Sequence, residues 1–132
     1  MAEDFETYLK KIKFSKHFKK LNSKLKNKTI IVYGSGSLFI YIKENFDLSN
    51  LNIIGISDMK FTPEQEGDDY LGYKIIPKNK IVDYKPDYVL IATQNYVPLI
   101  ESFVCRELKD TDINVAALAK KPLFTVLKEI WS

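Results

Sequence analysis

The stretch that decides the fold is Thr29-Ile30-Ile31-Val32-Tyr33-Gly34-Ser35-Gly36-Ser37. Its first five residues are apolar or β-branched at nearly every position, which is typical of a strand covered on both faces. The two glycines interrupt this run, and the apolar residues 38–42 that follow continue with helical spacing. The sequence therefore predicts a buried strand, a tight glycine turn, and a helix that begins at that turn.

The same alternation continues along the chain. A second buried-type strand is predicted at 52–58, and further strands at 73–76, 88–93 and 113–118. Helices are expected at 37–46, 78–84, 98–109 and 123–131. Strands that alternate with helices indicate an α/β fold with a mainly parallel sheet of about five strands and helices on both faces. In such sheets the binding crevice lies at the carboxyl ends of the strands.

Residues 4–26 precede this unit and are predicted to be helical. Phe5, Tyr8, Leu9 and Ile12 form one apolar stripe, and Phe14, Phe18, Leu21 and Leu25 form a second that is out of phase with the first. Because the two stripes are out of phase, a bend or break is predicted near residues 13–15. We therefore divide the chain into a lysine-rich helical extension, residues 1–27, and a nucleotide-binding domain, residues 28–132.

The extension also carries the positive charge. Residues 1–28 hold nine lysines against three acids, whereas the whole chain of 132 residues has a net charge of only +3. This helix is expected to pack on the sheet domain or on a second subunit. The interleaved lysines and apolar residues also allow contact with an anionic membrane surface. Nineteen of the twenty basic residues are lysine, and because arginine reads base edges better, this bias argues against nucleic acid as a partner.

Composition narrows the remaining classes of protein. The length favours one domain, and 45% hydrophobic residues suffice for a core. The sequence shows neither a secretory signal nor an apolar stretch long enough to cross a bilayer. The single cysteine, Cys105, cannot form an internal disulfide, so a cytoplasmic location is expected. We predict no metal site.

The glycine turn predicts a phosphate site. Gly34 permits the tight turn, Gly36 lets a phosphate approach the backbone, and the amides at the helix start attract its negative charge. Ser35 and Ser37 add hydroxyl groups that donate to a phosphate or cap the helix. Phe39 occupies the position at which dinucleotide-binding turns carry a third glycine, so the dinucleotide signature is incomplete.

Two further features complete the candidate site. Asp58 ends the second strand, where an acid accepts hydrogen bonds from both ribose hydroxyls and disfavours a 2′-phosphate. Thr93, Gln94 and Asn95 follow the central strand and are expected to hydrogen-bond a ribose, a sugar or a nicotinamide. We assign no catalytic residue.

Four segments in this order carry a family resemblance: residues 30–37, 53–58, 71–76 and 87–93. Together they resemble the Rossmann-like domains of bacterial surface-polysaccharide and nucleotide-sugar enzymes. A neighbouring resemblance is to the cofactor domain of glucose-fructose oxidoreductase-type dehydrogenases, on Ala92-Thr93-Gln94-Asn95 and Lys120-Lys121-Pro122. The substrate domain of that type is absent from this chain.

The resemblance implies a Rossmann-like three-layer sandwich that binds NAD, NADP or a UDP-sugar in glycan biosynthesis. Such a module would act in a homo-oligomer, with a partner glycan-biosynthesis protein, or as part of a larger enzyme. One alternative is a small oligomeric NAD-dependent sugar oxidoreductase or epimerase, with Lys121 or a tyrosine in the proton-transfer role. A second alternative is a Rossmann-like scaffold for protein–protein interaction, whose pocket Phe39 fills.

Overall fold

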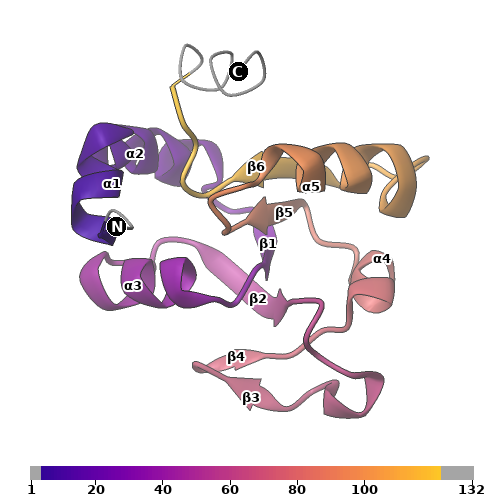
Figure 1. Ribbon diagram of the computed structural model, residues 1–132. Helices are drawn as coiled ribbons and strands as arrows, with labels where there is room; N and C mark the ends of the chain where they lie inside the picture. The colour runs from indigo at the N-terminus through magenta and orange to yellow at the C-terminus, as the bar shows by residue number, and fades with distance from the viewer. Residues whose placement is uncertain (1–3, 123–132) are drawn as a thin grey trace.

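The computed structural model of the chain describes residues 4–122. A four-stranded sheet forms its centre, and Figure 1 shows the helices around it. The strands are β1 (Thr29–Tyr33), β2 (Asn52–Ser57), β5 (Tyr88–Ile91) and β6 (Asn114–Ala117). The helices are α1 (Phe5–Lys11), α2 (Phe14–Lys24), α3 (Ser37–Asn45), α4 (Ile81–Tyr84) and α5 (Val97–Ser102). Short turns of helix lie at Pro63–Gln65, Lys78–Lys80 and Phe103–Glu107.

The sheet has the order β2-β1-β5-β6, and every pairing in it is parallel. The chain runs outward from β1 to β2 and then returns to the other side of β1 to form β5. The strand order therefore reverses between β1 and β5. In open parallel sheets this reversal creates the crevice in which ligands bind.

Alternate side chains of each strand enter two separate cores. Ile30 and Val32 of β1 join the core under α1, α2 and α3, whereas Ile31 and Tyr33 join the core under α4 and α5. This alternation follows from the two-residue repeat of a strand. The predicted α/β fold with helices on both faces of the sheet is confirmed.

The predicted fifth strand is reduced to a bridge. Residues 73–76 were expected to form a strand of the main sheet, but only Ile75 pairs with it, through a parallel bridge to Ile56. The two residues before Ile75 form β4 (Tyr73–Lys74), which pairs with β3 (Asp69–Tyr70) in an antiparallel hairpin. Gly72, with φ of +87°, lies in the turn of this hairpin.

The N-terminal helices belong to the core of the sheet domain. The chain breaks between α1 and α2 at Lys13, which has φ of 58° and ψ of 47°, so the predicted bend is present. Leu9, Phe14 and Leu25 are each 3% exposed or less in the core under α3. The sequence allowed this apolar surface to meet a membrane, but it is buried against the protein's own sheet. No helix in residues 4–122 is long and apolar enough to span a membrane.

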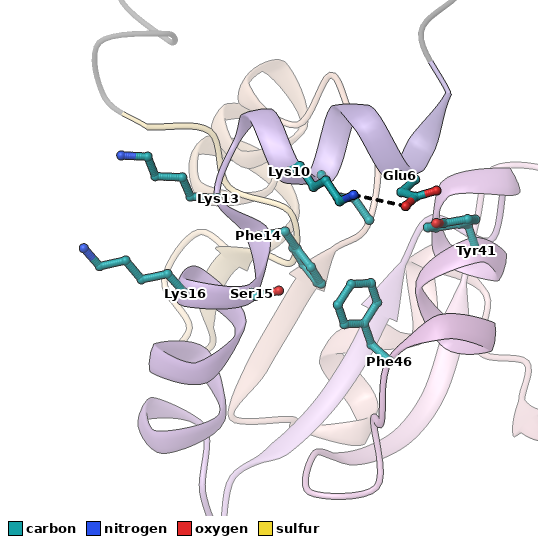
Figure 2. Close-up of a pocket in the computed structure, with 9 residues that line it drawn as sticks. Glu6, Lys10, Lys13, Phe14, Ser15, Lys16, Tyr41 and Phe46 are labelled. Carbon is teal, nitrogen blue, oxygen red and sulfur yellow. Dashed lines mark hydrogen bonds and ion pairs between the residues drawn. The ribbon is translucent and has the colours of Figure 1, made fainter.

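Aromatic side chains join these helices to α3. Phe14 meets Phe46 edge-on with ring centroids 4.8 Å apart, and Figure 2 shows the two rings facing one another. Beside them lies a cavity of about 420 Å³, bounded also by Leu9 and Tyr41. Lys13 and Lys16 extend away from this cavity in the same view.

Two predicted helices need comment. The helix expected at 98–109 is α5, which continues as a wider π-helical turn over Phe103–Glu107. The helix expected at 123–131 lies outside the described residues.

Candidate nucleotide site at the glycine turn

Gly34 allows β1 to end directly against the end of β5. Its φ is +112°, a conformation that L side chains rarely adopt. A Cβ at this position would lie 2.8 Å from Cγ2 of Thr93 and 3.4 Å from the carbonyl carbon of Ala92. The Gly34 amide donates a hydrogen bond to the Ser57 carbonyl, 2.9 Å away. Both the backbone angle and the close approach therefore require glycine here.

Gly36 starts α3 and faces open space. It has an extended conformation, with φ of −79°, and no side chain caps the helix. A Cβ at Gly36 would meet no atom within 4 Å, and Gly36 and Ser37 are both exposed. The first amides of a helix have no partner within the helix. At α3 no side chain caps these amides, so they can receive an anion.

Ser35 and Asp58 form direct hydrogen bonds with each other. The Ser35 amide and hydroxyl both donate to Oδ2 of Asp58, each at 2.8 Å. The Lys60 amide donates to Oδ1 at 3.1 Å. The sequence predicted that Ser35 would face a phosphate and Asp58 a ribose, but the structure shows them bonded to each other. Asp58 thereby connects the end of β2 to the glycine turn.

Asp58 is ionised at neutral pH despite its partial burial. Burial alone would raise its pKa, but the hydrogen bonds from Ser35 and Lys60 and the charge of Lys60 hold the pKa below its ordinary value. An ionised carboxylate offers about four acceptor sites, of which three are used here. The fourth remains for a ligand hydroxyl.

Thr93 lies beside Gly34 at the end of β5. Its Oγ1 is buried and has no hydrogen-bond partner within residues 4–122, which is uncommon for a buried hydroxyl. Gln94 and Asn95 follow it and are exposed. The topology therefore brings the glycine turn, Asp58 and Thr93 together at the carboxyl ends of the strands, as predicted. Whether these residues and Gln94 and Asn95 bind a ligand stays a prediction.

The β3–β4 hairpin adds Tyr70, which the sequence interpretation did not place in the site. The Tyr70 hydroxyl donates to the Ser35 carbonyl at 3.2 Å. The Lys60 ammonium donates to the Tyr70 hydroxyl at 3.0 Å and lies 4.7 Å from the centre of its ring. The positive charge of Lys60 is therefore connected to the glycine turn through two hydrogen bonds, with the Tyr70 hydroxyl between them. No local pattern in the sequence indicated this contact, because it depends on how the hairpin folds back.

Phe39, at the third-glycine position, is fully buried in the core under α3. Its ring lies 6.1 Å from that of Tyr73 in β4. Lys121, the lysine named in the oxidoreductase alternative, lies beside α5. Its amide donates to the Tyr96 hydroxyl at 2.9 Å, and its ammonium is 6.0 Å from the Tyr96 ring. Within residues 4–122, no group of histidine, cysteine, aspartate or glutamate residues is arranged to hold a metal ion.

Several solved structures resemble the chain in fold. RSP in complex with β-NAD⁺ and operator DNA is 18% identical, with a TM-score of 0.45, and the match covers 89% of this chain and 62% of that one. RSP in complex with β-NADH is 17% identical, with a TM-score of 0.46, and the match covers 89% and 65%. A third structure, of RSP described as a Rex-family repressor, gives the same values as the NADH complex. The chain thus spans less than two thirds of the RSP chain.

These matches correct one expectation. The lysine bias was taken to argue against nucleic acid, yet an RSP structure of similar fold contains operator DNA. That exclusion is therefore wrong. The physical reason is that lysine is a sufficient partner for backbone phosphates, even where arginine is the better reader of bases. None of these three structures is described as a surface-polysaccharide or nucleotide-sugar enzyme, so this part of the resemblance is unsupported.

No curated protein matches the sequence significantly. A family match covers the strands and the glycine turn: the family described as C2185-like, N-terminal, matches residues 26–118. This is well over half of the chain, and the protein therefore belongs to the C2185-like N-terminal family.

Proposed function

We propose that the protein is a nucleotide-binding module that holds an NAD-type dinucleotide over the glycine turn. One observation carries this proposal: the start of α3 is exposed and uncapped, and it lies where the strand order reverses, between Asp58 and Thr93. A helix N-terminus carries roughly half a positive elementary charge in addition to its free amides. The diphosphate of a dinucleotide supplies the matching negative charge.

The chemistry of Asp58 favours NAD over NADP. Its ionised carboxylate can accept a hydrogen bond from a ribose hydroxyl but repels a 2′-phosphate. Lys60 acts in the opposite direction, but its ammonium is already hydrogen-bonded to the Tyr70 hydroxyl. A free 2′-hydroxyl is therefore the better match to the end of β2.

The buried hydroxyl of Thr93 supports a polar ligand group beside the turn. Its Oγ1 has no partner in the described residues, and the same side chain lies next to Gly34 through its Cγ2 methyl group. A ligand hydroxyl or amide that reached it would satisfy a group that otherwise costs about 1–3 kcal/mol. Gln94 and Asn95 stay candidates for the same ligand.

A UDP-sugar is the alternative ligand, because its diphosphate suits the same helix start. The lysine version of the oxidoreductase alternative needs Lys121 at the reacting centre, and the contacts of Lys121 with Tyr96 do not favour that role. Binding without chemistry is consequently the activity that the geometry supports best.

Titration calorimetry with NAD⁺, NADP⁺ and UDP-glucose tests the proposal. NAD⁺ is expected to bind most tightly, and Gly36→Val is expected to weaken it at least tenfold. The valine meets no protein atom but occupies the space over the helix start. Asn52→Val is the matched control, because Asn52 is exposed at the opposite end of the sheet.

Both variants should unfold at the temperature of the wild type, which separates loss of binding from loss of fold. Absence of saturable binding for all three compounds at millimolar concentration would contradict the proposal. Tight binding that survives Gly36→Val would place the ligand elsewhere. Binding of UDP-glucose alone would replace the dinucleotide by a nucleotide-sugar.

A further inference from the structure

The outer edge of β6 has no strand partner among the described residues. β6 is the last strand in the order β2-β1-β5-β6 and pairs with β5 on one side only. The strand order of larger dinucleotide-binding folds continues with one more strand at this place. An edge of this kind exposes backbone groups that can pair with another strand.

The register shows which backbone groups face outward. The Asn114 amide donates to Asp87 and the Leu118 amide to Ile91, so these residues direct their amides toward β5. Residues between them alternate in direction. The amides of Val115 and Ala117 therefore point away from β5. The Ala117 carbonyl does so too, because Nε2 of His17 lies 3.0 Å from it.

A cavity of about 310 Å³ runs along this edge. One wall is α2, which contributes His17, Lys20 and Lys24, and the other is α5, which contributes Ile100. The two walls belong to opposite faces of the sheet, because α2 covers one core and α5 the other. A strand added beside β6 would consequently place alternate side chains against two different surfaces.

Those two surfaces differ in charge. Lys20, Lys24 and Lys120 line the cavity, and among residues 4–122 no acidic side chain lines it. All three lie close enough to His17 to lower its pKa, in addition to the larger effect of burial. The α5 wall is apolar where Ile100 lines it. Alternate positions of an added strand would therefore meet lysines and an apolar surface.

We propose that the edge of β6 is a docking site for an extended peptide segment with alternating acidic and apolar side chains. The backbone of the segment pairs with Val115 and with the amide of Ala117, whose carbonyl stays in contact with His17. Its acids face Lys20, Lys24 and Lys120, and its apolar side chains face α5. This is strand addition to a sheet edge, in which the backbone supplies affinity and alternate side chains supply specificity. The site is separate from the glycine turn and does not depend on nucleotide binding.

A synthetic peptide of alternating glutamate and valine, with blocked ends, is the probe. NMR titration of the full chain is expected to show saturable shifts at the Val115 and Ala117 amides. Val115→Pro should abolish binding, because it removes an outward amide. Proline is tolerated at edge positions whose amide faces away from the neighbouring strand, so this variant should still fold.

A charge reversal keeps the test valid if the proline variant fails to fold. Lys20→Glu combined with Lys24→Glu should weaken the glutamate peptide at least tenfold and create binding of a lysine–valine peptide. Lys43→Glu combined with Lys85→Glu is the matched control, because these exposed lysines lie outside α2 and do not line the cavity. This pair should leave binding within about twofold, since separated surface charges are screened.

Three results would overturn the proposal. Absence of peptide binding at millimolar concentration would mean that the lysines only protect the edge from pairing. Equal binding of the glutamate and lysine peptides would show that the lysines do not select the partner. Dimers that form through β6 and dissociate in Val115→Pro, measured by sedimentation, would make a second copy of the chain the occupant instead.

Discussion

Asp58 receives three hydrogen bonds and connects the end of β2 to the glycine turn. This linkage has a consequence for the pH dependence of stability. Because the pKa of Asp58 is lower in the folded chain than in an unfolded one, ionised Asp58 stabilises the fold above its unfolded pKa. That contribution is lost as the pH falls through the folded pKa.

Asp58→Asn is therefore expected to lower the free energy of unfolding by about 1–2 kcal/mol at neutral pH. The difference between wild type and variant should shrink as the pH falls below about 4, the ordinary pKa of an aspartate, and on through the lower pKa of folded Asp58. Urea denaturation at a series of pH values measures both quantities. A difference that stays constant down to pH values well below 4 would show that the charge of Asp58 contributes nothing.

Gly34 and Gly36 have different roles although they are two residues apart. Gly34→Ala is expected to destabilise the fold by about 1–3 kcal/mol, because φ is positive and the added methyl meets Thr93. Gly36→Ala is the control and should change the free energy of unfolding by less than about 0.5 kcal/mol. Equal effects of the two substitutions on urea denaturation would contradict this assignment.

At the scale of the elements, α2 is a structural part of the sheet domain. The sequence predicted one apolar stripe on α1, a second on α2 and the bend between them. It favoured packing of these stripes on the sheet domain or on a second subunit, and left contact with a membrane open, because a lysine-rich amphipathic helix suits each of these surfaces. Which surface covers the helix depends on the path of the chain from α2 into β1. Helical periodicity shows that one face of the helix is apolar, but it does not show this path.

Leu25→Ala tests the packing of α2 on the sheet. Leu25 is fully buried, so its truncation should cost about 2–5 kcal/mol of unfolding free energy. Val104→Ala is the matched control at a side chain that is 54% exposed, and it should cost less than about 0.5 kcal/mol. Both values come from urea denaturation. A negligible cost for Leu25→Ala would mean that α2 does not pack on the sheet in solution.

The hairpin β3–β4 marks the limit of prediction from local patterns. The run Tyr73-Lys74-Ile75-Ile76 has the composition of a buried strand, yet its first two residues pair with Asp69 and Tyr70 instead of the main sheet. A short antiparallel pairing across a glycine turn is a local contact, whereas joining the sheet closes a longer loop. The same folding-back brings the Tyr70 hydroxyl to Ser35 and to Lys60, which no spacing in the sequence indicated.

At the scale of the whole molecule, the sequence predicted the fold class and that the candidate site lies at the carboxyl ends of the strands. Strands buried on both faces and separated by helices allow few topologies, and in these topologies the glycine turn, Asp58 and Thr93 share one end of the sheet. The bond between Ser35 and Asp58 could not be predicted, because either residue alone suits a ligand. Only the structure shows that the amide and hydroxyl of Ser35 donate to the carboxylate of Asp58.

The free edge of β6 is also visible only at this scale. Its residues Asn114-Val115-Ala116-Ala117 are typical of any short strand. The lysines that line the adjoining cavity come from α2 and from residue 120, about one hundred positions apart. The two proposed binding regions, one at the start of α3 and one beside β6, are therefore separate on the assembled molecule.

The measurement that tests the central claim most directly is an NMR titration of the full chain with NAD⁺. We predict saturable shifts that are largest at the amides of Gly36, Ser37 and Thr93, and that disappear in Gly36→Val. Absence of shifts at millimolar NAD⁺ would contradict the claim. So would shifts confined to the cavity between α1, α2 and α3, because the nucleotide would then bind away from the glycine turn.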